Sequence, residues 1–135
     1  QYRHGTDELT LEIPGGMVEA GEDAATAAAR ELREETGYTG GAPELLGIVH
    51  PNPAFQNNVC FTYLIPDARE TDPPQLDEGE HIRVVRRPLA EVPSLIRSGA
   101  ITHSLVICGF TWLFLSDEAA FGASARPGVD AGRLV

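Results

Sequence analysis

The sequence predicts a single α/β domain in which helices cover both sides of a mixed β-sheet, an α/β/α sandwich. Two observations support this class. Short strand-like segments alternate along the chain with longer segments of helical character. The length of 135 residues is also typical of one domain, and a hydrophobic content of 42% supplies enough apolar side chains for one buried core.

The first predicted elements are a strand and a helix joined by a glycine turn. Residues 8–13 alternate polar and apolar side chains, and the sequence PGG that follows ends the alternation. Residues 24–36 are rich in alanine and contain no glycine or proline. Asp23 before them and Gly37 after them are typical of a helix start and stop. We therefore expect one helix over residues 24–36.

The middle of the chain predicts further strands. Residues 45–50 and 59–65 are apolar, β-prone segments, and a turn rich in proline and asparagine separates them at 51–58. Residues 66–79 are polar and contain several prolines, which indicates a loop. Residues 82–85 are the last predicted strand.

Two helices and a tail complete the prediction. The proline-bounded segment 89–97 predicts one short helix. Thr102 is placed to cap a helix over residues 103–117, whose apolar run suits a helix buried on most sides and is too short to span a bilayer. We assign residues 1–118 to the folded domain. Residues 119–135, rich in Gly, Ala and Pro, are assigned to a flexible C-terminal tail.

Composition limits the partners. The formal net charge is −10 with a pI near 4.7, and all ten basic residues are arginines. Such a protein is repelled by nucleic acid and by anionic membranes, so neither is an expected partner. The two cysteines, Cys60 and Cys108, lie inside apolar runs and are interpreted as buried free thiols, not as a disulfide. Free thiols favour a reducing compartment, and we expect the cytoplasm.

The most specific pattern lies in residues 16–38. A glycine, a glutamate and the run RELREETGY stand there at fixed intervals. On the predicted helix, Glu31, Glu34 and Glu35 share one side. Carboxylates at this spacing repel each other by roughly 0.2–0.5 kcal/mol per pair. A divalent cation would reverse that repulsion, and hard cations such as Mg²⁺ bind carboxylates together with substrate phosphates. The alternative is a solvated helix face with ordinary surface glutamates.

The same segment resembles the signature of the Nudix hydrolases, Gly-x5-Glu-x7-Arg-Glu-apolar-x-Glu-Glu-x-Gly-apolar. The matching residues are Gly16, Glu22, Arg30, Glu31, Leu32, Glu34, Glu35 and Gly37, with Tyr38 at the last, usually aliphatic, position. The resemblance covers residues 1 to about 117. It implies a Nudix-type sandwich and a metal-dependent hydrolase.

The resemblance also implies roles for the matching residues. Glu31, Glu35 and the carbonyl of Gly15 are expected to bind Mg²⁺ or Mn²⁺, and Glu34 is expected to be a further ligand or to lie beside the metal. Glu34 and Glu35 are thereby expected to take part in catalysis. Arg30 is close enough to Glu34 to orient or partly neutralise the acidic cluster. Gly16, Glu22 and Gly37 are expected to support the loop and helix.

A second carboxylate region lies in the predicted loop before residue 82. Members of the family often carry a glutamate in this region that binds metal or acts as general base on the attacking water. Glu80 is the preferred residue here, and Glu78 and Asp77 are alternatives. An exposed acidic loop without catalytic role explains the sequence equally well.

Substrate contacts are expected from Arg3, Glu12, Pro53 and Phe55. A guanidinium such as that of Arg3 can donate two parallel hydrogen bonds to phosphate oxygens. Glu12 and Pro53 lie in segments that look like the ADP-ribose and ADP-sugar branch, although Ala54 stands where that branch usually has glycine. Phe55 is a candidate for stacking on a base. A surface arginine and a plain hairpin turn are the alternatives. By resemblance, His103 is expected near the rim of the site.

The resemblance therefore implies hydrolysis of the pyrophosphate bond in a nucleoside diphosphate linked to another moiety. ADP-ribose or a sugar nucleotide is the preferred substrate, giving a nucleoside monophosphate and a phosphorylated product. The alternatives are a nucleoside triphosphate pyrophosphohydrolase that clears damaged nucleotides, and a nucleotide-sensing domain without catalysis. Relatives of the ADP-ribose type are often dimers through N-terminal strands. Because the chain begins at Gln1 without methionine, we expect such strands upstream and leave a homodimer open.

Overall fold

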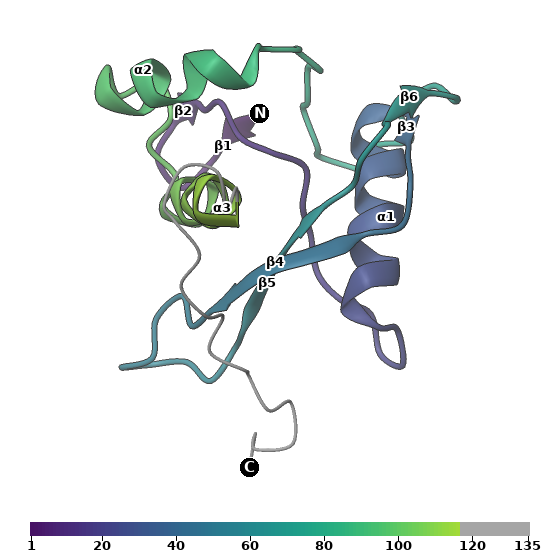
Figure 1. Cartoon of the computed structure of the whole chain (residues 1–135), viewed down its shortest axis with the longest axis horizontal. Coiled ribbons are helices and arrows are strands. Elements are labelled where there is room, and N and C mark those ends of the chain that lie inside the picture. Colours follow the sequence, from purple (N-terminus) through teal and green to yellow (C-terminus); the bar gives the residue numbers. More distant parts are fainter. Residues whose placement is uncertain (117–135) are drawn as a thin grey trace.

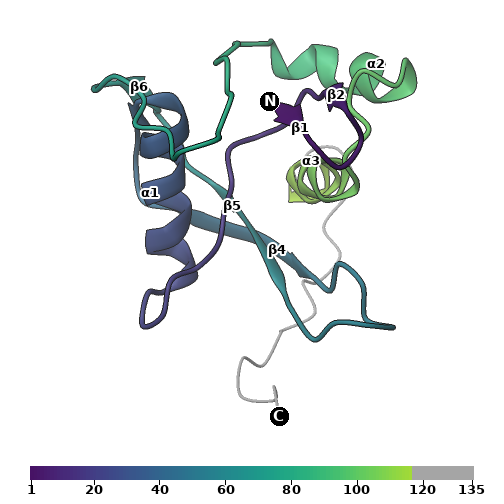
Figure 2. The same cartoon turned by 180° about the vertical axis from the view of Figure 1, so that it is seen from behind.

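The computed structural model describes residues 1–116 and shows a β-hairpin that runs between two helices (Figure 1). The hairpin consists of β4 (Glu44–Val49) and β5 (Cys60–Leu64). Helix α1 (Ala24–Thr36) contacts β5 on one side, and α3 (Ser104–Ser116) packs against both strands on the other. The view from behind also shows the hairpin between these two helices (Figure 2). The predicted α/β class, with helices on two sides of the strands, is confirmed.

The strands form three separate antiparallel pairs in the part of the chain that the structure describes. Besides the hairpin, β1 (Tyr2–Arg3) pairs with β2 (Glu8–Leu9), and β3 (Tyr38–Thr39) pairs with β6 (Arg69–Glu70). These ladders do not join into one hydrogen-bonded mixed sheet. The predicted loop over 66–79 therefore contains a short strand.

Two predicted strands are corrected. The strand predicted over 8–13 is reduced to Glu8–Leu9, and residues 82–85 are not in a strand. Alternating or apolar sequence favours extended backbone, but a strand also needs a neighbour that supplies ladder hydrogen bonds. In residues 1–116 no strand pairs with residues 10–13 or 82–85.

Helix α1 has the predicted bounds because both caps form. The side chain of Asp23 accepts hydrogen bonds from the backbone N–H groups of Ala25 and Thr26 at 3.1 Å each. Gly37 ends the helix in the left-handed conformation, with φ of 76°, and its N–H donates to the carbonyl of Arg33. A side chain at Gly37 would also overlap with the carbonyl oxygen of Asp72. Glycine is therefore required here for two reasons.

The remaining helices build the apolar core. The predicted helix 89–97 is present as a 3-10 turn (Leu89–Glu91) continuing into α2 (Val92–Arg97). The predicted helix 103–117 corresponds to α3, and Asp117 lies outside the described residues. The buried residues of the core cluster are Val92, Ile101 and Val106, and the partly buried residues around them are Leu11, Leu95, Ile96, Ile107, Phe110 and Phe114. The core thus lies between α2, α3 and the segment after β2.

Helix α3 is less buried than predicted, since most of its residues are half-buried and Leu115 is exposed. The indole of Trp112 lies against Gly47 of β4, where a Cβ atom would overlap with the ring. Cys60 and Cys108 are free thiols, as predicted, but they are half-buried. None of the described helices is long and apolar enough to cross a membrane.

Candidate active site

Two carboxylates of α1 reach the glycine turn that precedes the helix. The backbone N–H of Gly15 donates to Oε2 of Glu35 at 2.9 Å, and Glu35 is a buried residue, with 7% exposure. The carboxylate of Glu31 lies directly on Gly16, where a Cβ atom would overlap with it. Glycine at position 16 therefore leaves the space that Glu31 fills. Helix and turn together bring two acidic groups to one place.

The environment of Glu35 disfavours its charged form. Burial raises the pKa of Glu35 to about 6, the hydrogen bond from Gly15 opposes this, and the negative charges of Glu31 and Glu80 raise the pKa further. Arg3 contributes a smaller, opposite effect. A carboxylate with these neighbours gains from any additional positive charge.

Arg30 holds the outer part of the acidic cluster. Its guanidinium forms two hydrogen bonds with Glu22, at 3.0 and 3.1 Å, and one each with Glu31 and Glu34, at 2.9 and 2.8 Å. A further bond at 2.9 Å reaches the carbonyl of Met17. The pKa of Arg30 is raised above its ordinary value by Glu22 first, and then by Glu34 and Glu31. The predicted contact of Arg30 with Glu34 is confirmed, and Arg30 ties the helix to the loop before it.

The donor set fits a hard divalent cation. Within residues 1–116, no three acidic, histidine or cysteine side chains lie close enough together to hold a metal as they stand. Arg30 binds the carboxylates of Glu31 and Glu34. The side-chain groups at the glycine turn are nevertheless carboxylates, whose oxygens are donors that Mg²⁺ prefers. The charge on Glu31 and Glu35 is also only partly compensated.

Arg3 and Glu12 form a second charged group beside the first. Nε and Nη2 of Arg3 donate to the two carboxylate oxygens of Glu12 at 2.8 and 2.6 Å. The hydroxyl of Thr10 donates to the same carboxylate at 2.6 Å. The pKa of Arg3 is raised mainly by this pairing with Glu12 and further by Glu35 and Glu80. Arg3 is therefore paired with Glu12 and also lies within the electrostatic influence of Glu35.

The loop that contains Glu80 lies next to β1. The backbone N–H of Tyr2 donates to the carbonyl of His81 at 3.3 Å. Glu80 closes a tight turn, because its own N–H donates to the carbonyl of Asp77 and its carboxylate accepts from the N–H of Asp77 at 3.1 Å. Of the three carboxylates predicted as alternatives here, Glu80 is the one whose charge raises the pKa of Glu35.

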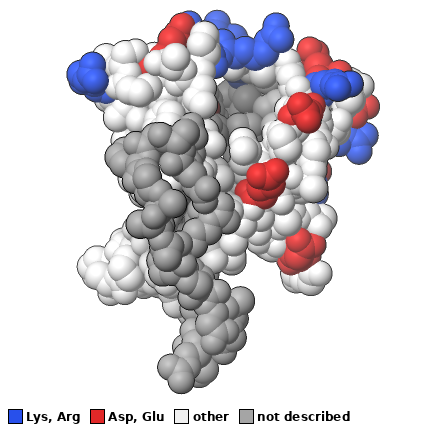
Figure 3. Space-filling view, in the orientation of Figure 1, with Lys and Arg blue, Asp and Glu red and all other residues white. Residues whose placement is uncertain are grey.

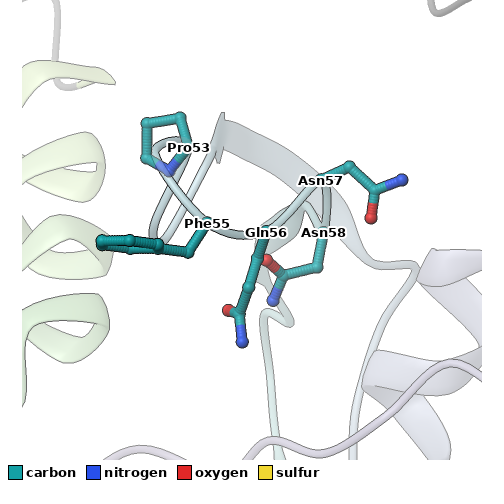
Figure 4. Close-up of a pocket in the computed structure, with 5 residues that line it drawn as sticks. All are labelled: Pro53, Phe55, Gln56, Asn57 and Asn58. Carbon is teal, nitrogen blue, oxygen red and sulfur yellow. The ribbon is translucent and has the colours of Figure 1, made fainter.

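Pro53 and Phe55 lie apart from the acidic cluster. They belong to the loop at the end of the β4–β5 hairpin, which projects away from α1 in both views (Figures 1 and 2). Together with Gln56, Asn57 and Asn58 they line an open hollow of about 600 Å³ (Figure 4). Phe55 is 86% exposed. The structure thus brings together Gly15, Arg3, Glu12 and the glutamates, but not this loop.

Charge is unevenly distributed over the surface. Figure 3 shows acidic side chains along the side of the molecule where α1 lies, whereas arginines gather along the edge at the top of that view. Sequence reasoning did not predict Thr10 or the Met17 carbonyl as parts of the site. Neither carries a sequence signal, because their contacts depend on how the loops fold.

The pairing of Arg3 with Glu12 predicts acid-dependent stability. The pKa of Glu12 is lowered to about 2, first by the hydrogen bonds from Arg3, against the effect of burial, and by Thr10. A lowered carboxyl pKa stabilises the fold above the unfolded value near 4.5, and the contribution is lost as the pH falls towards 2. We expect Glu12→Gln to lower the free energy of unfolding by about 1–2 kcal/mol at pH 7, a value reduced for the partial exposure of Arg3.

Urea unfolding between pH 7 and pH 2.5 measures this effect. The difference in unfolding free energy between Glu12→Gln and the unchanged protein is expected to decrease steadily below about pH 4.5. Glu8→Gln, an exposed substitution on β2, is the control and leaves the unfolding free energy nearly unchanged. A difference that stays constant over the whole range would contradict the charge pairing.

Comparison with known proteins gives matches in sequence and in fold. The family model described as "NUDIX domain" matches residues 1–107. An ADP-ribose pyrophosphatase of Saccharomyces cerevisiae is 37% identical over 98 residues, covering 69% of this chain and 42% of that protein. A CMP-5'-(N-acetyl-N-hydroxy-3-aminopropyl)phosphonate hydrolase of Streptomyces rubellomurinus is 33% identical over 130 residues, covering 94% of this chain and 60% of that protein.

A solved structure supports the fold. The crystal structure of an ADP compounds hydrolase superposes with a TM-score of 0.78 at 23% identity, covering 89% of this chain and 65% of that one. The chain thus spans 42% to 65% of the length of these proteins. Since the match to the family model includes the glycine turn, all of α1 and the Glu80 loop, this chain belongs to the NUDIX domain family.

Proposed function

We propose that this chain hydrolyses the pyrophosphate bond of a nucleoside diphosphate linked to another moiety, with ADP-ribose or a sugar nucleotide as preferred substrate. The products are a nucleoside monophosphate and a phosphorylated remainder. The observation that carries the proposal is the convergence of Glu31 and Glu35 on the Gly15 and Gly16 turn. The charge of Glu35 also raises the pKa of Arg3.

Mg²⁺ or Mn²⁺ is the proposed cofactor. Glu31, Glu35, the carbonyl of Gly15 and, with them or beside them, Glu34 would hold it. When bound, such an ion offsets the charge of the pyrophosphate oxygens and lowers the pKa of a bound water. Arg30 keeps the glutamates in place and limits their mutual repulsion. Gly16, Glu22 and Gly37 support the same loop and helix.

The remaining residues act on the substrate. Glu80 is proposed as the general base that takes the proton of the attacking water, and its charge already acts on Glu35. The guanidinium of Arg3 is proposed to bind a phosphate, and Glu12 to hold that guanidinium in position before the substrate binds. Pro53 and Phe55 stay predicted contacts for the parts of the substrate beyond the pyrophosphate.

Relatives support the substrate class. The yeast relative is named for ADP-ribose, and the Streptomyces relative is named for a CMP-linked phosphonate. In both names a nucleotide is linked to another group. A small-molecule nucleotide is thus the proposed partner, and the half-buried free thiols of Cys60 and Cys108 support the cytoplasm as the proposed location.

A substrate panel with Mg²⁺ tests the proposal. We expect ADP-ribose to give AMP and ribose 5-phosphate, measured by chromatography of the products, and a nucleoside triphosphate to give little inorganic pyrophosphate. Release of pyrophosphate from triphosphates, with ADP-ribose left intact, would identify the triphosphate enzyme instead. Calorimetry that shows tight nucleotide binding without hydrolysis would identify a sensing domain.

A further inference from the structure

The carboxylate of Glu12 depends on different donors at its two oxygens. Oε1 accepts from Nε of Arg3 at 2.8 Å and from the hydroxyl of Thr10 at 2.6 Å. For Oε2, the hydrogen-bond donor among the described residues is Nη2 of Arg3, at 2.6 Å. The side chain of Glu12 is 7% exposed. If Arg3 left, Oε1 would keep one donor, whereas Oε2 would be a buried anionic oxygen without one.

A nitrogen of His103 also lies near this oxygen. Nδ1 of His103 lies 3.8 Å from Oε2 of Glu12, too far for a hydrogen bond. This nitrogen is buried and has no hydrogen-bond partner among residues 1–116. Buried polar atoms in folded proteins nearly always have a partner, so an orphaned one calls for an explanation. The main chain of His103 is fixed at the start of α3, since its carbonyl accepts from Ile107 at 3.1 Å.

Arg3 could also bind a ligand on the side of the acidic cluster. Its side chain is 44% exposed, and the charges of Glu35 and Glu80 act on it from the side of the acidic cluster. A phosphate held at that cluster would compete with Glu12 for the same guanidinium, because both ligands accept paired hydrogen bonds from it. The buried carboxylate of Glu12 would then need a replacement donor, since unpaired buried charges are strongly unfavourable.

We propose that His103 is a positioning residue. It replaces Arg3 as the hydrogen-bond donor to Oε2 of Glu12 when Arg3 binds a substrate phosphate. The Nδ1–H of His103 donates to Oε2, and Thr10 keeps Oε1, so Glu12 stays paired in both states. The exchange needs the Nδ1 to Oε2 distance to shorten by about 1 Å. No covalent bond changes. The inference rests on the proposed function through the phosphate role of Arg3.

Two substitutions at His103 separate donation from packing. In His103→Asn the amide nitrogen occupies the place of Nδ1 and can donate, whereas His103→Leu fills similar space without a donor. We expect His103→Leu to raise the KM for ADP-ribose about tenfold with kcat within about twofold, because a contact to bound substrate is weakened without changing the chemical step. His103→Asn stays within about threefold of the unchanged protein. Equal effects of the two substitutions would overturn the proposal.

A double-mutant cycle with Glu12→Gln shows whether His103 acts through Glu12. Glutamine carries no charge that must stay paired, so His103→Leu should add less than about twofold to the KM of Glu12→Gln. A merely structural role would instead give independent, additive effects. Thermal unfolding of each variant shows whether a rise in KM is caused by unfolding. Additive KM changes in folded variants would overturn the proposal.

A readout without turnover completes the test. The probe is methylene diphosphonate with Mg²⁺, a pyrophosphate analogue that is not hydrolysed, and the ¹⁵N NMR shift of His103 Nδ1 reports whether this nitrogen donates. We expect the probe to shift Nδ1 to the position of a hydrogen-bonded donor, while His50, at the far end of β4, stays unchanged as internal control. Binding of the probe without this shift overturns the exchange alone. No binding of the probe overturns the exchange and the proposed function together.

Discussion

Glu35→Gln is expected to abolish Mg²⁺-dependent turnover of ADP-ribose, with kcat/KM lowered by about a thousandfold or more and the fold intact. Glutamine has the shape of glutamate and keeps an oxygen that can accept from the N–H of Gly15, so the link between α1 and the glycine turn survives. It lacks the negative charge that the proposed site uses to hold a divalent cation. Steady-state kinetics and circular dichroism of the same samples measure both effects.

A matched control removes a glutamate charge elsewhere. Glu44 is exposed at the start of β4, and Glu44→Gln should keep both the rate and the melting temperature of the unchanged protein. Near-normal turnover by folded Glu35→Gln would sink the proposed mechanism. Loss of folding in Glu35→Gln alone would show instead that the carboxylate is needed for structure.

The second large effect is expected from Arg30→Gln. This change removes the guanidinium that joins Glu22 to Glu31 and Glu34 and that also binds the Met17 carbonyl. Three carboxylates would then face each other without their shared counter-charge. We expect kcat/KM to fall about 10- to 100-fold, which is usual for residues that orient metal ligands, and the melting temperature to drop by several degrees.

Arg33→Gln is the control for Arg30→Gln on the same helix. Among residues 1–116, Arg33 forms one exposed ion pair, with Asp72 at 2.9 Å, and exposed pairs contribute little to stability. Arg33→Gln should therefore leave kcat/KM and the melting temperature nearly unchanged. If the two substitutions had the same effect, the central role of Arg30 would be refuted. Arg30→Lys is expected to lie between them, since one ammonium group cannot bind all the partners of a guanidinium.

Local signals were sufficient to predict α1 from the sequence. Both helix ends are determined by residues next to them, through the side chain of Asp23 and the left-handed backbone of Gly37. The two-residue strands β3 and β6 carry no alternation, and their pairing joins segments about thirty residues apart. The same dependence on distant partners explains why the prediction of a strand at 82–85 was wrong. Apolar, β-prone residues were present there, but no described strand lies beside them.

The acidic cluster could be predicted because its residues stand at fixed spacing on one helix. Arg30 and Glu34 are four residues apart, and the predicted contact is present at 2.8 Å. The group of Arg3, Glu12 and His103 is different, because its members come from β1, the segment after β2 and the start of α3. Helical spacing cannot predict such a meeting. The resemblance suggested each of the three residues separately, and only the fold shows that they are neighbours.

The contact between Trp112 and Gly47 provides a fluorescence reporter for the separation of α3 from the β4–β5 hairpin. The chain contains a single tryptophan, and its indole lies on the bare backbone of β4, where no side chain separates ring from strand. Tryptophan emission depends on how much water reaches the indole. Since α3 carries the ring and the hairpin carries the glycine, a change in emission marks the separation of these two elements. Undocking of α3 can therefore be followed by fluorescence in the unmodified protein, without an attached label.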